Sequence, residues 1–287
     1  MTPQRPWSWY WSLGSHVFES HHDAIRSACQ AAGVHSVEMH PFQFEGKALE
    51  QLEGLEQDYA EAGVQIDSFH LPFGAQDDLA NFYETERRRA VERTRFWLER
   101  MPALKVRIAV QHPSTNRSSV DVEGLDPFLR QLGRSLETLL PVAESNGVLF
   151  ALENMPPGLD GGRFGSRLRH FERFVEEFDH PSLRFCLDTG HALMAGGPEG
   201  VGSFFEVMAP RLAAFHLADN AGDRDSHLAP GHGLVDWDAF FRQAARLDHR
   251  HGMCVEAPPF APAPYRPEAW KELFEGVDEL VRRALRD

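Results

Sequence analysis

Short apolar runs alternate along the chain with longer segments that have helical periodicity. The short runs have the length of strands, and the pattern predicts eight: Trp9–Leu13, Ser36–Met39, Gln65–Phe69, Val106–Gln111, Val148–Leu152, Leu183–Leu187, Leu212–Phe215 and Gly252–Val255. The longer segments repeat apolar residues three, four and seven positions apart, as one buried helix face requires. They predict helices over segments such as His21–Ala32, Glu84–Arg100, Pro127–Asn146, Arg169–Phe178, Trp237–Leu247 and Pro267–Leu285.

This alternation of strands and helices is typical of an α/β fold with a parallel sheet. Eight strand–helix units favour closure into a (β/α)8 TIM barrel, with residues 1–287 forming a single domain. A doubly wound open sheet is the alternative. At the N-terminus, Trp7, Trp9 and Trp11 alternate by two, so their rings should share one strand face. That face would either fill the base of the barrel or line its pocket.

Composition narrows the possible partners. The net charge is −14, from 43 acidic and 29 basic residues, and this charge repels nucleic acid and anionic membranes. Cys29, Cys186 and Cys254 are widely spaced within apolar stretches, which predicts buried free thiols. No apolar run approaches the length of about 18 residues that a membrane span needs. We therefore expect a soluble, cytoplasmic protein with no membrane partner and no nucleic-acid substrate.

Side chains that can bind metals occur where six of the predicted strands end: His70, His112, Glu153, Asp188, His216 and Glu256. Successive positions are separated by 28 residues (188 to 216) to 42 residues (70 to 112), about one strand–helix unit each. They should therefore meet at the C-terminal rim, where barrel active sites are built. A lone strand-end His is commonly a packing residue. Six such positions together favour a divalent cation that relieves carboxylate repulsion, and donors without thiolate suit Zn²⁺, Mn²⁺, Co²⁺ or Mg²⁺.

Further candidate donors lie in the segments after the sixth and seventh predicted strands. His191 follows Asp188 by three positions, and Asp225-x-His227 lies in a loop rich in glycine and proline. Two other acids in this region have structural explanations. Asp236 is predicted to cap the following helix, and Asp219 either orients a metal ligand or braces the loop.

Three motifs carry a resemblance to a known family. They are Leu-Glu-Asn at 152–154, Leu-Asp-Thr-Gly-His at 187–191, and His-Leu-x-Asp at 216–219 with its continuation through Pro-Gly-x-Gly to Val-Asp-Trp. With these motifs the chain resembles, over essentially its whole length, the xylose isomerase-like TIM-barrel superfamily. This superfamily groups sugar isomerases and epimerases, including sugar-phosphate enzymes, with the endonuclease IV-type AP endonucleases (AP endonuclease family 2).

The two branches of the superfamily imply different ligand sets. The isomerase branch implies a metal held by Glu153, Asp188, His216 and Glu256, with both glutamates as an acid–base pair and His191 touching the sugar. The endonuclease branch implies three zinc ions held by nine ligands: His70, His112, Glu153, Asp188, His191, His216, Asp225, His227 and Glu256. All nine positions carry the matching residue types. The resemblance thus implies one to three ions per chain, and it allows a homo-oligomer.

The first hypothesis is a metal-dependent isomerase or epimerase acting on a keto-sugar or sugar phosphate. Glu153 or Glu256 would remove a proton from carbon, and the other glutamate would return it. His191 and His112 would bind sugar hydroxyls, while an aromatic ring such as Trp11 or Phe73 would pack on the sugar.

The alternative is a zinc-cluster phosphodiesterase of the endonuclease IV type, which the complete nine-ligand set favours. The acidic rim loops oppose a DNA substrate, since phosphates need Lys, Arg or hydroxyl donors. The arginines of segment 161–169 are the best candidates for a phosphate contact, although they could equally be solvated residues at a helix start. Another metal-assisted lyase or hydrolase on sugars is a further possibility. A barrel used only for binding has little support, because no implied ligand is missing.

Overall fold

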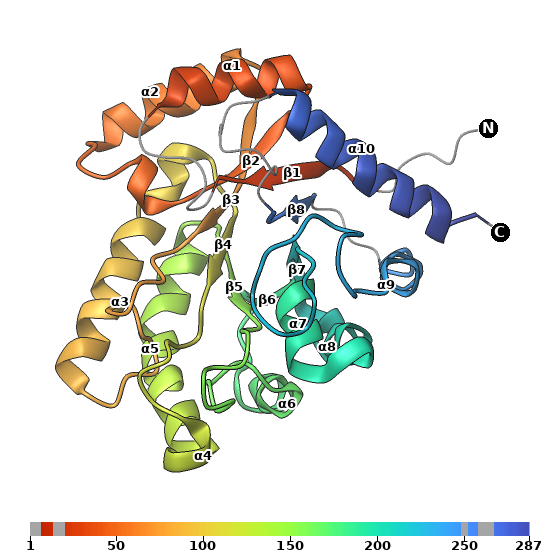
Figure 1. Cartoon of the computed structure of the whole chain (residues 1–287). Helices are drawn as coiled ribbons and strands as arrows, with labels where there is room; N and C mark the ends of the chain where they lie inside the picture. Colours follow the sequence, from red (N-terminus) through yellow and green to blue (C-terminus); the bar gives the residue numbers. More distant parts are fainter. Residues whose placement is uncertain (1–6, 14–20, 248–251, 258–266, 287) are drawn as a thin grey trace.

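The structure is a computed structural model, and it describes residues 7–13, 21–247, 252–257 and 267–286. Eight parallel strands pair in chain order, and β8 pairs back with β1, so that the sheet closes into a barrel. This closure confirms the predicted (β/α)8 fold and rules out the doubly wound sheet (Figure 1). The strands are β1 Trp9–Ser12, β2 Ser36–Met39, β3 Gln65–His70, β4 Ile108–Gln111, β5 Leu149–Glu153, β6 Leu183–Asp188, β7 Leu212–Leu217 and β8 Met253–Val255.

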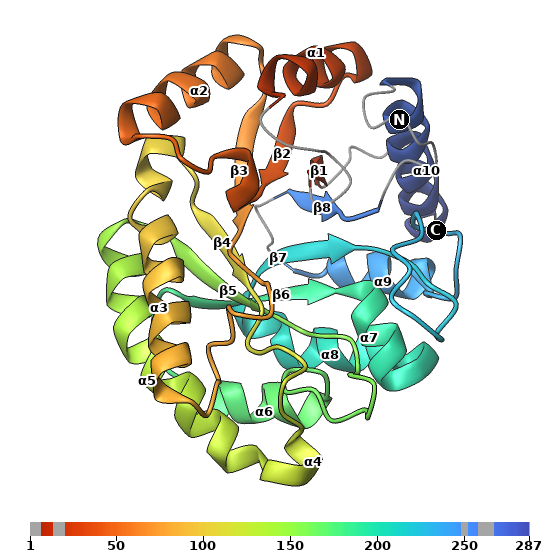
Figure 2. The same cartoon turned by 60° about the vertical axis from the view of Figure 1, so that its left-hand side comes forward.

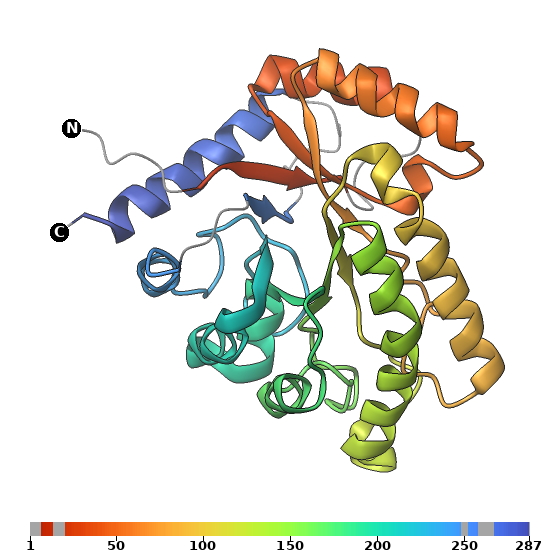
Figure 3. The same cartoon turned by 180° about the vertical axis from the view of Figure 1, so that it is seen from behind.

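The helices surround the strands on the outside of the barrel (Figures 1 and 3). They are α1 His22–Ala32, α2 Leu49–Glu61, α3 Glu84–Leu98, α4 Val120–Glu123, α5 Leu125–Ser145, α6 Leu168–Glu177, α7 Thr189–Gly196, α8 Gly200–Met208, α9 Trp237–Ala244 and α10 Pro267–Ala284. Short 3-10 helices lie at Pro41–Gln43, Met101–Leu104, Gly197–Glu199 and Ala209–Arg211. Among the described helices, none combines the length and apolarity needed to cross a bilayer.

The ring of helices closes where α10 packs against both α9 and α1, which brings the last helix beside the first. In Figure 2, α3 and α5 lie outside β3 to β5, while α9 and α10 lie near β7 and β8. Helix α5 shows why these segments are helical. Phe128, Leu132, Leu136 and Leu139 recur at intervals of three or four and are all buried.

Inside the barrel, a small apolar cluster fills the space beneath the rim: Ile108, Val110, Ala151, Cys186 and Ala214. The three cysteines are buried free thiols, as predicted. This packed interior is a platform that holds the strand ends in fixed positions.

Four strands run further than the sequence pattern predicts, to His70, Glu153, Asp188 and Leu217. The reason is that their last residues remain paired with neighbouring strands; Asp188, for example, pairs with His216 across β6 and β7. The candidate donors on these strands are consequently fixed by the hydrogen-bonded sheet. A donor on a strand is held more rigidly than one on a free loop.

The N-terminal tryptophans share one face, as predicted, but that face points outward. The Trp7 and Trp9 rings lie 5.9 and 6.0 Å from Phe241 of α9, and Trp11 lies 4.2 Å from Trp270 of α10. These rings therefore fill the layer between the barrel and its helices. They neither fill the base of the barrel nor line its pocket, which were the two alternatives predicted from the sequence.

Candidate functional site

A cavity of about 220 Å³ opens at the C-terminal ends of the strands. Its lining includes most of the predicted site residues, namely His70, Phe73, His112, Glu153, His191, Asp225, His227 and Glu256. Asp188 and His216 lie buried beneath the same surface. The structure thus brings all nine candidate ligands together, in three groups.

The first group consists of Glu153, Asp188, His216 and Glu256, whose donor atoms all lie within 4.8 Å of one another. Nδ1 of His216 lies 3.2 Å from Oε1 of Glu153 and 2.9 Å from Oε2 of Glu256. Glu153 ends β5 and Glu256 directly follows β8, so the group spans the C-terminal ends of strands from β5 to β8. It is the four-ligand set that the isomerase resemblance implies.

The second group consists of His70, His112 and Glu153. Nε2 of His70 and Nε2 of His112 lie 3.4 and 3.3 Å from Oε2 of Glu153. Nδ1 of His70 lies 2.9 Å from the carbonyl oxygen of Leu71. A proton on Nδ1 would donate to that carbonyl and leave the Nε2 lone pair facing the cavity, as a metal ligand requires.

The third group consists of His191, Asp225 and His227. The two Nε2 atoms lie 3.2 and 3.3 Å from opposite oxygens of the Asp225 carboxylate. The two Nδ1 atoms lie 2.8 Å from the Asn154 carbonyl and 2.9 Å from the Glu256 carbonyl. Both rings are therefore oriented by backbone carbonyls behind them, with Nε2 directed at the shared carboxylate.

The buried carboxylates of these groups have the electrostatic properties expected of a cation-binding site. Burial is the main reason that the pKa of Asp188 is raised to about 7; the charge of His191 lowers it, and Glu153 and Glu256 add to the increase. Burial would also raise the pKa of Glu153, but His216 and hydrogen bonds from neighbouring histidines hold it well below its ordinary value. Oε2 of Glu153 and Oδ2 of Asp188 are buried without a hydrogen-bond partner among the described residues. Buried carboxylate oxygens without a hydrogen bond are suitable ligands for a divalent ion.

The sequence reasoning missed Glu38, which lies fully buried on β2 inside the barrel. Ser12 and Ser68 are its register partners on β1 and β3, and their hydroxyls donate hydrogen bonds of 2.9 and 2.7 Å to its two oxygens. Nε2 of His216 lies 3.2 Å from Glu38 Oε2, behind the Nδ1 atom that faces the ligand group. His216 therefore lies between an interior carboxylate and the carboxylates of the candidate ligand group.

The two predicted aromatic contacts differ in position. The Phe73 ring lines the cavity, 4.6 Å from the His70 ring and 5.1 Å from the His112 ring. Trp11 is absent from the described lining, and its indole N–H donates instead to the carbonyl of Ala257. Of these two aromatic residues, Phe73 is the one positioned to touch a molecule in the cavity.

The two further acids of the β7–α9 segment act on the loop. Asp219 accepts hydrogen bonds from the backbone of Gly231 and Val235 and from the indole of Trp237, at 3.0, 3.1 and 2.8 Å. Of its two predicted roles, loop bracing is the one its contacts support. Asp236 caps α9 through a backbone N–H in the first turn, as predicted.

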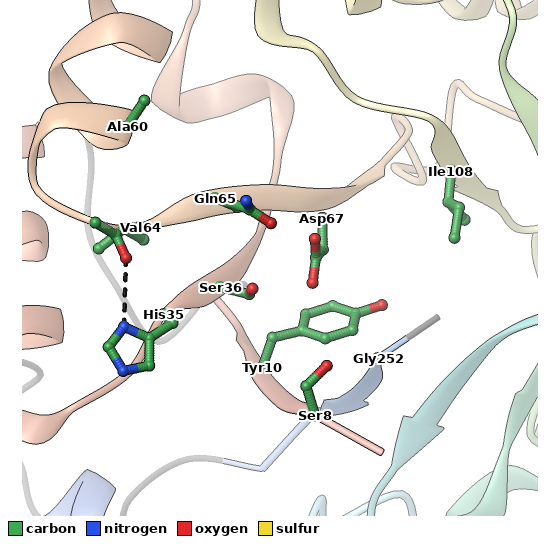
Figure 4. A pocket seen from close by; sticks show the side chains of 11 residues that line it. Ser8, Tyr10, His35, Ser36, Ala60, Val64, Gln65, Asp67, Ile108 and Gly252 are labelled. Carbon is green, nitrogen blue, oxygen red and sulfur yellow. Dashed lines mark hydrogen bonds between the residues drawn. The ribbon is translucent and has the colours of Figure 1, made fainter. Parts of the chain in front are cut away.

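A larger cavity, of about 530 Å³, lies at the opposite end of the barrel, where the strands begin. Figure 4 shows Tyr10, Ser36 and Asp67 facing this space, with His35 at its edge. Among its described lining residues there is no group of three metal-donating side chains. The nine candidate ligands all lie at the other end of the barrel, at the C-terminal rim.

Comparison with known proteins identifies the family of this chain. Residues 27–284 match the family described as xylose isomerase-like TIM barrel. The chain belongs to this family. Among curated proteins, the uncharacterized protein y4fM of Sinorhizobium fredii is 27% identical over 219 residues, which cover 69% of this chain and 68% of that protein.

Solved structures agree with membership of the xylose isomerase-like family at the level of the fold. A D-tagatose 3-epimerase-like protein superposes with a TM-score of 0.75 at 22% identity, covering 97% of this chain and 100% of that one. The 3-keto-D-glucoside 4-epimerase YcjR of E. coli gives 0.77 at 16% identity, covering 95% and 99%. The IOLI protein with a bound zinc atom gives 0.71 at 16% identity, covering 97% and 98%.

Proposed function

We propose that this chain is a divalent-metal-dependent isomerase or epimerase of a keto-sugar or sugar phosphate. The observation that carries the proposal is the placement of Glu153 and Glu256. Both carboxylates face Nδ1 of His216 within one four-donor group, and both line the small cavity at the rim. They come from strand ends separated by β6 and β7, so they approach the cavity from different sides.

Glu153, Asp188, His216 and Glu256 are the residues that would hold the cation. When bound, a divalent ion polarises neighbouring carbonyl and hydroxyl oxygens of a sugar and so acidifies the C–H between them. Burial raises the pKa values of Glu153 and Glu256, but the charge of His216 outweighs it, and both lie below their ordinary value. Both glutamates are therefore ionised near neutral pH, and either can accept the proton.

Other cavity residues would bind and orient the sugar. Burial lowers the pKa of His112 to about 4, so this ring is neutral near pH 7 and can hydrogen-bond a hydroxyl. His191 lies on the adjacent side of the cavity, and the exposed face of Phe73 can pack on the apolar face of a sugar ring. The sugar epimerases among the solved neighbours support this substrate class.

A second candidate function, zinc-cluster phosphodiesterase, is favoured by the other two groups. These groups supply donors beyond the four that an isomerase site needs: His70 and His112 in one, and His191, Asp225 and His227 in the other. With Glu153 shared, the chain can offer sites for three ions. The net charge of −14 makes a nucleic acid the less suitable phosphodiester, so a small phosphoester is the substrate to test.

The test begins with the number of metal ions per chain, measured by inductively coupled plasma mass spectrometry on protein purified without added metal. The metal-loaded protein is then incubated in D2O with a panel of ketoses, and deuterium incorporation next to the carbonyl is followed by NMR. We expect about one ion per chain and deuterium incorporation. Glu153→Gln and Glu256→Gln should each reduce the exchange rate by about 10²- to 10⁴-fold.

The matched control is Glu50→Gln, because Glu50 is an exposed glutamate of α2. It should leave the exchange rate unchanged. About three zinc ions per chain, no exchange with any ketose and hydrolysis of bis(p-nitrophenyl) phosphate would replace the isomerase with the phosphodiesterase. A homo-oligomer stays a prediction, and light scattering on the purified protein measures it.

A further inference from the structure

Arg163 places a positive charge at the wall of the metal-binding cavity. It lies in the loop between β5 and α6 and lines the same space as Phe73, Glu153 and Asp225. The proposed proton transfer does not use it, and it is not one of the nine candidate ligands.

The guanidinium of Arg163 is poorly satisfied by the protein around it. Nη2 donates one hydrogen bond, of 3.2 Å, to the carbonyl of Ser114. Nε is buried with no partner, and no carboxylate of the described residues lies within ion-pair distance. Burial accordingly lowers the pKa of Arg163 below its ordinary value, although Glu153 and Asp225 partly oppose this. An unpaired, partly buried cation is costly for a protein unless another partner completes it.

A second arginine of the same loop shows the contrast. Arg167 is exposed and forms a two-pronged ion pair with Asp121, with N–O distances of 2.7 and 2.5 Å. Arg167 is satisfied within the protein, and it is not in the described lining of the cavity. Arg167 is thus an exposed residue at the start of α6, which is the alternative to a phosphate contact that the sequence offered for these arginines.

The loop holds Arg163 in place. The next residue, Phe164, is fully buried, and Nδ1 of His170 accepts hydrogen bonds from the backbone of Gly165 and Arg167 at 3.0 and 3.3 Å. The hydroxyl of Ser166 donates to the Arg163 carbonyl at 2.8 Å. The guanidinium is thus presented by a fixed backbone, and its unused donors can meet a ligand at small entropic cost.

We propose that Arg163 binds an anionic group of the substrate, a phosphate or a carboxylate, so that the enzyme acts on a negatively charged sugar. This inference rests on the proposed sugar-directed function and specifies its substrate class. A guanidinium offers planar paired donors that match both anions. The cavity carboxylates Glu153 and Asp225 already face histidines at 3.2 to 3.4 Å, so they do not complete this arginine.

The test compares three sugars that differ only at the terminal carbon: D-glucose, D-glucuronate and D-glucose 6-phosphate. Their dissociation constants are measured by calorimetry on the manganese-loaded full chain, for the wild type and Arg163→Met. Arg167→Met is the matched control. We expect the wild type to bind at least one anionic sugar about 10- to 100-fold more tightly than glucose. Which of the two it prefers identifies the group as phosphate or carboxylate.

Arg163→Met should lose this preference while its affinity for glucose and its metal content stay unchanged, and Arg163→Lys should restore part of it. Arg167→Met should behave as the wild type. No preference in the wild type, or a preference that survives in Arg163→Met, would overturn the proposal. A charge preference without ketose exchange would contradict the isomerase alone. Exchange on neutral ketoses with no charge preference would contradict the anion site alone.

Discussion

Replacing Glu38 with glutamine tests how the interior of the barrel controls the candidate ligand His216. Glu38 is reached by Nε2 of His216, while Nδ1 of the same ring faces Glu153 and Glu256. A shift in the β2–β3 register between Val37 and Glu38 accompanies this inward placement, as irregularities in strand pairing often do. Because Glu38 fixes the proton on Nε2, it keeps the Nδ1 lone pair available for a cation. We therefore assign Glu38 as a positioning residue.

The expected magnitude follows from the contacts. Glutamine has nearly the volume of glutamate, so Glu38→Gln removes a charge and creates no cavity. Burial would raise the pKa of Glu38, but the contact with His216 holds it at about 2, so the carboxylate is ionised at neutral pH. A hydrogen bond to a charged group contributes about 1.5 to 3 kcal/mol. Loss of that contribution corresponds to a decrease in metal affinity of about 10- to 100-fold.

The assay is a titration of the metal-free protein with Co²⁺, followed by the visible absorption of the bound ion and by competition with a chelator. Glu38→Gln should weaken binding and change the absorption spectrum, since the orientation of the His216 ligand is altered. Ser68→Ala is the matched control, because it removes one donor to Glu38 and leaves the His216 contact in place. It should change the affinity less than fivefold, in line with about 1 kcal/mol for one neutral bond. Unchanged affinity and spectrum in Glu38→Gln would refute the assignment.

Replacement of Asp219 by alanine should lower the free energy of unfolding by about 3 to 5 kcal/mol, because it leaves the buried donors of Val235 and Trp237 and the part-buried donor of Gly231 unpaired. An unchanged urea midpoint would contradict this. Burial lowers the pKa of His170 to about 4 from 6.5, so its stabilising contribution is complete above pH 6.5 and decreases as the pH falls towards 4. The stability difference between the wild type and His170→Gln should shrink by about 2 kcal/mol between pH 7.5 and 5, and a constant difference would argue against this reading. Chelation should lower Tm by restoring repulsion among the rim carboxylates, and added Zn²⁺ should reverse it; equal Tm values with and without metal would count against a bound ion.

The rim donors could be predicted from sequence because two regularities coincide. Parallel strands of a barrel end on one face, and the spacing of His112, Glu153 and Asp188 matches the length of one strand–helix unit. The loop donors Asp225 and His227 follow no such regularity. They were predicted from the motif resemblance. In the structure, Nε2 of His227 lies 3.3 Å from Oδ1 of Asp225, and Nε2 of His191 lies 3.2 Å from Oδ2 of the same carboxylate.

Other features depend on information that the pattern does not contain. Glu38 occupies a four-residue strand, and only the register with β1 and β3 shows that its carboxylate points inward between two serines. The shared face of Trp9 and Trp11 follows from alternation, but the direction of that face depends on which helices cover it. The position of Arg163 depends on the path of an irregular loop, which local sequence does not determine.

Glu153 connects the two candidate functions, because its two oxygens belong to different ligand groups. Oε1 faces His191 and His216, whereas Oε2 faces His70 and His112. An ion held by only the four-donor group leaves Oε2 with a lone pair that can accept a proton. Ions in both groups that share Glu153 would occupy both oxygens, and the carboxylate would then be a bridging ligand with little remaining basicity. The number of ions therefore decides the chemistry at this residue, because proton transfer by Glu153 requires the less metallated state and a phosphodiesterase cluster requires the more metallated one.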